Sequence, residues 1–154
     1  MTANTLTASY TRPADTTQYT ANDALAESTS APTALSFGSA GFGWIVGARC
    51  VDSNNATTLP QLRLYIFYGS PTAVNDNAAF TLSDANLRAC IAVLNFNVFV
   101  AGDDTSGTGG NAISMTAIDP VATTGPLYGL VKVLNAYTPI SAEVFTFSLD
   151  IDVK

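Results

Sequence analysis

The chain has 154 residues and a formal net charge of −6; charged residues make up 12% of it and apolar residues 47%. This length fits one compact domain, and the low charge predicts a surface of small uncharged side chains. The six basic residues are scattered, so we expect no nucleic-acid partner, because phosphate binding needs clustered lysine or arginine. No apolar run is long enough to span a membrane and the first residues lack a secretion signal, so we expect cytoplasmic synthesis and no membrane contact.

The N-terminal segment YTRPADTTQYTANDAL, residues 10–25, is too polar to form a core. Arg12 precedes a proline and is therefore biased toward an extended backbone, and Pro13 lacks the N–H that would continue a strand ladder. Asp15, which is followed by two threonines, favours a local turn. We predict that residues 1–22 form an extended arm, in part a strand, and that residues 23–154 form a single β-sandwich domain.

Two arrangements of this arm are open. In the first, it docks on another chain, with Tyr10 and Tyr19 as anchors and Arg12 paired with a carboxylate of the partner. In the second, it folds back on its own sandwich, and the two tyrosines cap one end of the core. The candidate interface residues are Tyr10, Arg12, Pro13, Asp15 and Tyr19.

Period-two alternation of apolar residues predicts three strands, at residues 61–68, 93–101 and 145–153. Their predicted inward faces are Leu62, Leu64, Ile66 and Tyr68; Leu94, Phe96, Val98 and Val100; and Phe145, Phe147, Leu149, Ile151 and Val153. Residues 44–51 and 127–137 are apolar on both faces and contain Gly47 and Gly129. We therefore expect these two runs to be central strands with bulges.

Helix is nearly absent from the pattern. Ser83 is placed to cap one short helical turn over residues 84–90, and residues 71–80 are a candidate for a second turn. Turn-rich spacers at 53–60, 69–77 and 101–111 join the apolar runs. The chain is predicted to be all-β, an antiparallel sandwich of about seven or eight strands, either jelly-roll-like or immunoglobulin-like.

The residue types needed for catalysis are missing or poorly placed. The sequence has no histidine, which excludes Ser-His-Asp and Cys-His catalysis and histidine metal sites. Most acids fall in predicted turns, where aspartate is common for backbone reasons alone. Asp103 and Asp104 do not have calcium-loop spacing, and GTGG at 107–110 lacks the lysine of a phosphate-binding loop. We expect no enzyme activity, no catalytic or metal-binding residue and no cofactor.

Three further features have a structural interpretation beside a functional one. Cys50 and Cys90 lie in apolar runs and are expected to be buried thiols, with a disulfide only if their strands are neighbours. Trp44 is either a core residue or a platform for a sugar ring. Asp150 and Asp152 lie on one face of the last strand, where we expect them to protect an exposed edge.

The pattern R-P-A-D-T-T-x-Y-T-A-x-D-x, followed by small or aliphatic residues, occurs here as RPADTTQYTANDALA from Arg12 to Ala26. It resembles the N-terminal region of a family of small virion proteins of tailed bacteriophages. Residues 63–96, RLYIFYGSPTAVNDNAAFTLSDANLRACIAVLNF, are similar to that family's strand, short polar segment and second strand. Together the two blocks cover about a third of the chain.

Members of this family are often described as head decoration or cement proteins and are typically β-sandwich or jelly-roll in type. The resemblance implies a protein that binds the outer surface of the major capsid protein shell and stabilises it, as a homotrimer at three-fold or quasi-three-fold positions. It implies a location on the capsid surface of the virion, while a tail or neck location stays open. The alternative is a carbohydrate- or receptor-binding module of a virion, which predicts an exposed Trp44 or Tyr137.

Overall fold

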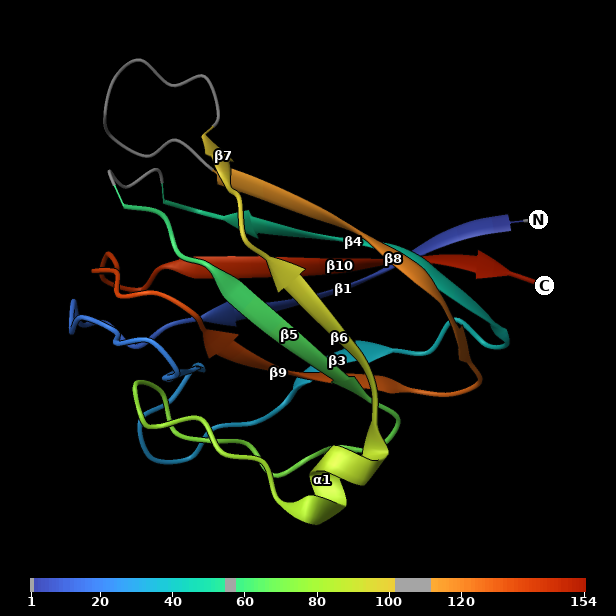
Figure 1. Cartoon of the computed structure of the whole chain (residues 1–154), viewed down its shortest axis with the longest axis horizontal. Helices are drawn as coiled ribbons and strands as arrows, with labels where there is room; N and C mark the ends of the chain where they lie inside the picture. The colour runs from blue at the N-terminus through green and yellow to red at the C-terminus, as the bar shows by residue number, and fades with distance from the viewer. Residues whose placement is uncertain (1, 55–57, 102–111) are drawn as a thin grey trace.

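The computed structural model describes residues 2–54, 58–101 and 112–154, which form a sandwich of two antiparallel sheets (Figure 1). The elements are β1 (Thr2–Thr11), β2 (Ala24–Leu25), β3 (Leu35–Gly38), β4 (Gly43–Asp52), β5 (Leu62–Phe67), α1 (Asp84–Ala89), β6 (Cys90–Phe96), β7 (Val100–Ala101), β8 (Ala112–Thr123), β9 (Leu127–Val133) and β10 (Val144–Val153). The first sheet has the order β1-β10-β4-β8-β7 and the second β2-β9-β5-β6, with β3 also paired to β9. The predicted all-β sandwich is confirmed.

The alternation along β10 builds the centre of the first sheet, as the sequence predicts. Phe145, Phe147 and Leu149 are fully buried between the sheets, because successive side chains of a strand point to opposite faces. Phe147 meets Phe96 of β6 across the sandwich, with ring centroids 5.8 Å apart. The same side of β5 supplies three buried aliphatic side chains, so the core lies between β10 and β5.

The two runs that are apolar on both faces are central strands, as predicted. β4 lies between β10 and β8, and β9 lies between β5 and the short strands β2 and β3. The register of β4 shifts between Ile45 and Gly47, which is the predicted bulge. β9 keeps an unbroken register with β5, and Gly129 is instead required because a side chain there would meet Leu64 and Phe37.

The strand predicted over residues 93–101 is wrong in its second half. β6 ends at Phe96, and pairing resumes only at Val100 in the two-residue strand β7. The break changes which side chains face inward, since Phe99 is buried while Val98 is 71% exposed and Val100 is 63% exposed. The period-two pattern has no signal for such a break, because apolar residues continue at every second position through it. Asparagine is depleted in strands, but Asn97 at the break does not differ in this from Asn95 inside β6.

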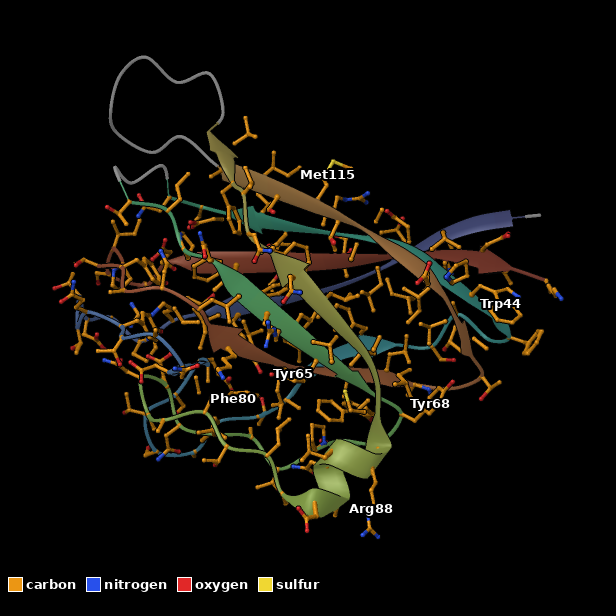
Figure 2. All side chains as sticks on the ribbon, viewed as in Figure 1. Trp44, Tyr65, Tyr68, Phe80, Arg88 and Met115 are labelled. Carbon is orange, nitrogen blue, oxygen red and sulfur yellow. The ribbon has the colours of Figure 1, made fainter. Side chains whose placement is uncertain are left out.

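The predicted helical turn after Ser83 is confirmed. The Ser83 hydroxyl accepts a hydrogen bond from the Asn86 N–H at 3.2 Å and begins α1, the single helix of the described ranges, whose six residues are far too few to cross a membrane. The second candidate is not helical: residues 71–80 form a loop that contains one hydrogen-bonded turn, in which the Ala78 N–H donates to the Asn75 carbonyl oxygen at 3.2 Å. Phe80 at the end of this loop stacks on Tyr65 of β5, with ring centroids 5.1 Å apart (Figure 2).

The predicted inward face of β5 is wrong at one residue. Tyr68 lies beyond the end of β5 and is exposed, so it does not share the buried face.

The N-terminal residues are part of the sandwich and not a separate arm. β1 pairs with β10 along its whole length, from Thr2 opposite Val153 to Thr11 opposite Val144. It joins the fold because Ala8 and Tyr10 point inward and are buried. Since β1 takes the edge position, β10 is an interior strand, and the prediction that Asp150 and Asp152 protect an edge is wrong.

The tight contact at Gly43 gives a test of this packing. A Cβ at Gly43 would lie 2.6 Å from the backbone oxygen of Asp152 on β10, and backbone atoms of a paired strand cannot move aside. We expect Gly43→Ala to lower the free energy of unfolding by about 1–3 kcal/mol, measured by urea denaturation. Gly125→Ala is the matched control, because a Cβ there meets nothing within 4 Å. Equal effects of the two substitutions would contradict the β4–β10 packing.

Candidate functional site

A buried ionic network occupies one end of the sandwich and explains the unusual N-terminal motif. The Arg12 side chain has no exposed surface and pairs with Asp76 at 3.2 Å. Tyr19 donates its hydroxyl hydrogen to Asp76 at 2.5 Å and accepts a hydrogen bond from Arg12 Nε. The Ala26 N–H donates to the same carboxylate at 2.9 Å. A buried guanidinium is tolerated when it is paired and hydrogen-bonded in this way.

A turn in the backbone between Arg12 and Tyr19 places both side chains in this network. The Asp15 carboxylate accepts a hydrogen bond from the Thr17 N–H at 2.9 Å, which forms the predicted turn. The chain then returns so that the Tyr19 ring stacks on Tyr137 with centroids 5.2 Å apart. Burial, followed by the hydrogen bond and charge of Asp76, raises the pKa of the Tyr19 hydroxyl. Tyr19 therefore remains a neutral donor over the whole physiological pH range.

The structure has the second of the two arrangements of the N-terminal segment. Tyr10, Arg12 and Tyr19 are at most 3% exposed within their own chain, so a second chain has no access to them as anchors. Tyr10 instead donates to the Thr33 carbonyl oxygen at 2.9 Å and accepts from the Leu35 N–H at 3.1 Å. Pro13 and Asp15 are partly exposed but flank the same network. No docking role is therefore proposed for these residues.

A second buried polar cluster lies beside the first and was not predicted from the sequence. Asp52 at the end of β4 and Glu143 just before β10 are both fully buried. Asp52 Oδ1 accepts from the Asn54 N–H at 2.9 Å, and Glu143 Oε2 accepts from the Ile140 N–H at 3.2 Å. The other oxygen of each carboxyl group has no hydrogen-bond donor among the described groups.

One proton shared between the two carboxyl groups accounts for these oxygens. Burial, and then the neighbouring charge of Glu143, raise the pKa of Asp52 to about 9. Burial also raises the pKa of Glu143. Two neighbouring like charges are strongly unfavourable at a buried site, so Asp52 stays protonated at neutral pH and hydrogen-bonds to the Glu143 carboxylate. Between described residues, no group of three or more potential metal-ligating side chains forms.

The outward face of the first sheet divides into two halves of different chemistry. On β1 and β10 it presents hydroxyl groups, with Thr7 paired to Ser148 at 3.2 Å and Ser9 paired to Thr146 at 3.0 Å. We call this the hydroxyl half. The residues opposite these hydroxyl pairs on the next strands, β4, β8 and β7, also face outward. There the outward residues are largely aliphatic. We call this the apolar half; its residues are Val51, Val100, Ile113 and Met115.

Three side chains of the apolar half, Val100, Ile113 and Met115, are exposed, and Val51 is half-buried. Val51, Ile113 and Val100 lie directly opposite one another on β4, β8 and β7. Met115, two residues along β8, is 71% exposed and lies on the far side of the molecule from α1 (Figure 2). The nearest charge, Arg49 opposite Met115, is paired with Asp150 at 3.2 Å. Contiguous exposed apolar surface of this kind marks interaction sites.

Neither of the two best-formed grooves among the described residues has the side chains of an active site. One, of about 330 Å³, lies between β6 and β8; the other, of about 410 Å³, lies between residues 72–75 and 81–86. Asp119 is the one ionisable side chain that lines either groove. With a single ionisable side chain between them, neither of these two grooves presents an acid–base pair. The predicted loop residues Asp103, Asp104 and 107–110 lie outside the described residues.

The two cysteines and the candidate aromatic platform have mainly structural environments. Cys50 is buried and Cys90 is half-buried, and both are free thiols. Tyr137 is 1% exposed, so it offers no ring to a sugar. Trp44 is half-buried, and the Lys154 ammonium lies 5.7 Å from the centre of its ring. A stacked sugar would first have to displace this cation.

Comparison of the chain with models of protein families, with curated proteins and with solved structures gives no match. A functional proposal therefore has to be argued from the fold, the buried clusters and the exposed faces.

Removing Asp76 tests the ionic network. We expect Asp76→Ala to lower the free energy of unfolding by about 3–5 kcal/mol, because Arg12 is left as a buried charge without its carboxylate. The matched control is Asp15→Ala, since Asp15 also contacts Arg12 but has a side chain that is 37% exposed; we expect a loss of less than about 1 kcal/mol. Urea denaturation at pH 7 measures both. A small effect of Asp76→Ala would show that Arg12 is not held as described.

The shared proton predicts a specific pH dependence. Folding raises the pKa of both carboxyl groups, so the associated stability is complete below about pH 4, where both states are protonated, and is lost as the pH rises toward the pKa of about 9 of Asp52. We expect the free energy of unfolding to fall by up to about 1.4 kcal/mol per pH unit in this range. Asp52→Asn keeps a hydrogen-bond donor beside Glu143 and should flatten this dependence, whereas Asp150→Asn should leave it unchanged.

Proposed function

We propose that the chain is a non-enzymatic virion protein that binds the outer surface of a capsid shell and stabilises it. The observation that carries the proposal is the apolar half, an exposed and nearly uncharged face on a regular sheet. Such a face suits contact with a large surface better than free solvation. The resemblance of the Arg12–Asp23 motif to tailed-phage decoration proteins supports the same function.

The strand order supports the finer inference that the sandwich is a jelly roll. The chain crosses between the sheets several times: β1, β4, β8 and β10 lie in the first, whereas β3, β5, β6 and β9 lie in the second. The first long strand, β1, lies beside the last, β10, and we take this neighbourhood as support for the two Greek keys of a jelly roll. Jelly rolls of this kind are common among viral capsid domains and lectins. The expectation of a trimer comes from the resemblance alone, so shell binding is proposed without a fixed copy number.

The alternative function, carbohydrate or receptor binding, has weaker support. It needs an accessible aromatic surface, and Phe42, which is 49% exposed, lies near the half-buried Trp44. Lys154 covers both rings, with its ammonium 5.8 Å from the centre of Phe42. Trp44 is the single tryptophan of the chain, so its fluorescence reports directly on this site. A change on adding a glycan would favour the alternative over shell binding.

A substitution on the apolar half tests shell binding. We expect Met115→Lys to reduce binding to shells of the major capsid protein at least tenfold, because a buried lysine at the contact would have to lose its hydration. The free energy of unfolding should stay within about 0.5 kcal/mol of the wild type, since Met115 is exposed. Binding is measured by co-sedimentation with shells assembled from the capsid protein encoded by the same virus.

The matched control is Leu87→Lys on α1. Leu87 is also an exposed apolar residue, at 53%, and α1 lies on the opposite side of the molecule from Met115 (Figure 2). This variant should bind shells as the wild type does. If the wild-type chain fails to co-sediment, shell binding is wrong; if both variants lose binding equally, the apolar half is not the contact.

A further inference from the structure

The free edges of the two sheets differ greatly in length and protection. The first sheet ends in β1 and β7, and the second ends in β2 and β6. β7 and β2 have two residues each, and short edges offer little backbone for pairing. β6 has seven residues and β1 has ten. β7 covers only Ala112 and Ile113 of β8, so the rest of β8 is a further edge, but that edge contains Asp119, Pro120 and a register shift against β4. β1 is therefore the longest described edge that has no charge, proline or bulge.

β1 also lacks the devices that usually protect an edge strand. Residues 2–11, TANTLTASYT, contain no charged residue and no proline. The register with β10 has no shift over the ten pairs, so no bulge twists the edge away. Natural proteins blunt edges with lysine, proline or bulges unless the edge is used. β6, by comparison, places Asn95 beside Arg63, with a 2.7 Å hydrogen bond between them.

We propose that β1 pairs antiparallel with β1 of a second copy of this chain, which joins the two first sheets into one continuous sheet across a two-fold axis. A two-fold interface must be complementary to itself. An uncharged strand meets this requirement, because no like charges face each other when it lies against its own copy. This matters in a chain with a formal net charge of −6, whose copies repel one another over most other contacts.

The hydroxyl half extends this complementarity beyond the backbone. Thr5, Thr7 and Ser9 point outward and are exposed. Within the chain this row already hydrogen-bonds to its neighbour on β10, for example Thr5 to Asp150 at 3.0 Å. Cross-strand threonine and serine pairs stabilise adjacent strands, and the same row lies beside its copy in the proposed pair.

The other end of β1 fixes where the two strands overlap. The Tyr10 hydroxyl bonds to Thr33 and Leu35, which brings residues 33–35 against that end of the strand. The open part of the edge is therefore centred near Thr5 to Thr7. The inference does not rest on shell binding, because the apolar half lies at the opposite edge of the same sheet.

Light scattering of the purified chain across a dilution series tests the proposal, with Thr7→Lys as the variant. We expect the wild type to have twice the mass of one chain at high concentration. Thr7→Lys should have the mass of one chain, because two lysines would then face each other near the two-fold axis. Thr146→Lys is the matched control: it adds the same charge to the same face one strand away from the edge and should remain a dimer.

Each outcome decides the question. A wild type that is monomeric up to millimolar concentration, or that forms a trimer, overturns the proposal, and so does a Thr7→Lys variant that keeps the wild-type mass. Circular dichroism confirms that each variant is folded, and Thr5→Lys replaces Thr7→Lys if that variant is not. Co-sedimentation of folded Thr7→Lys with capsid shells separates the two proposals, because loss of the dimer leaves the apolar half intact.

Discussion

The fold depends on the burial of one positive charge, the guanidinium of Arg12. A buried cation is stable only if an anion and further hydrogen-bonding groups accompany it. Asp76 and Tyr19 meet this need, and they come from segments that are far apart in the sequence. Because the pair must stay together, the chain after β1 and the loop before α1 are held against each other. The N-terminal motif is therefore explained by folding and not by contact with a partner.

The two buried polar clusters lie at the same end of the sandwich and share backbone contacts. The Arg12 N–H donates to the Glu143 carbonyl oxygen at 2.9 Å, so the residue that carries the buried cation also holds the loop that carries the buried acid. The positive charge of Arg12 lowers the pKa of Glu143, but burial raises that pKa by more. Stability at this end is thus expected to respond to pH, while the other buried polar residues of the described core, Ser114, Thr123 and Ser148, carry no ionisable group.

The sequence was sufficient for features that depend on local pattern and insufficient for those that depend on distant partners. The inward face of β10, the central position of β4 and the Ser83 cap follow from periodicity and capping rules. The break between β6 and β7 does not, because Asn97 and Val98 are compatible with a strand. The sequence left the packing of Tyr19 on its own sandwich as one of two open arrangements, and it gave no sign that Asp76, 57 residues beyond Tyr19, is the partner of Tyr19 and Arg12. An arginine before a proline in a polar segment resembles a docking residue until that partner is known.

The burial and pairing of charged residues explain why the outer surface of the first sheet carries so little charge. Arg12, Asp52, Asp76 and Glu143, four of the chain's few ionisable groups, are buried, and Arg49 and Asp150 neutralise each other on the outer face. The first sheet is consequently left with a face of hydroxyl and aliphatic groups and with one long uncharged edge. Exposed charge keeps a soluble protein monomeric, because it opposes association. A surface with so little charge therefore offers no advantage to a monomer. A protein that lies against a shell and beside its own copies does gain, since each contact then forms without leaving an unpaired charge in the interface.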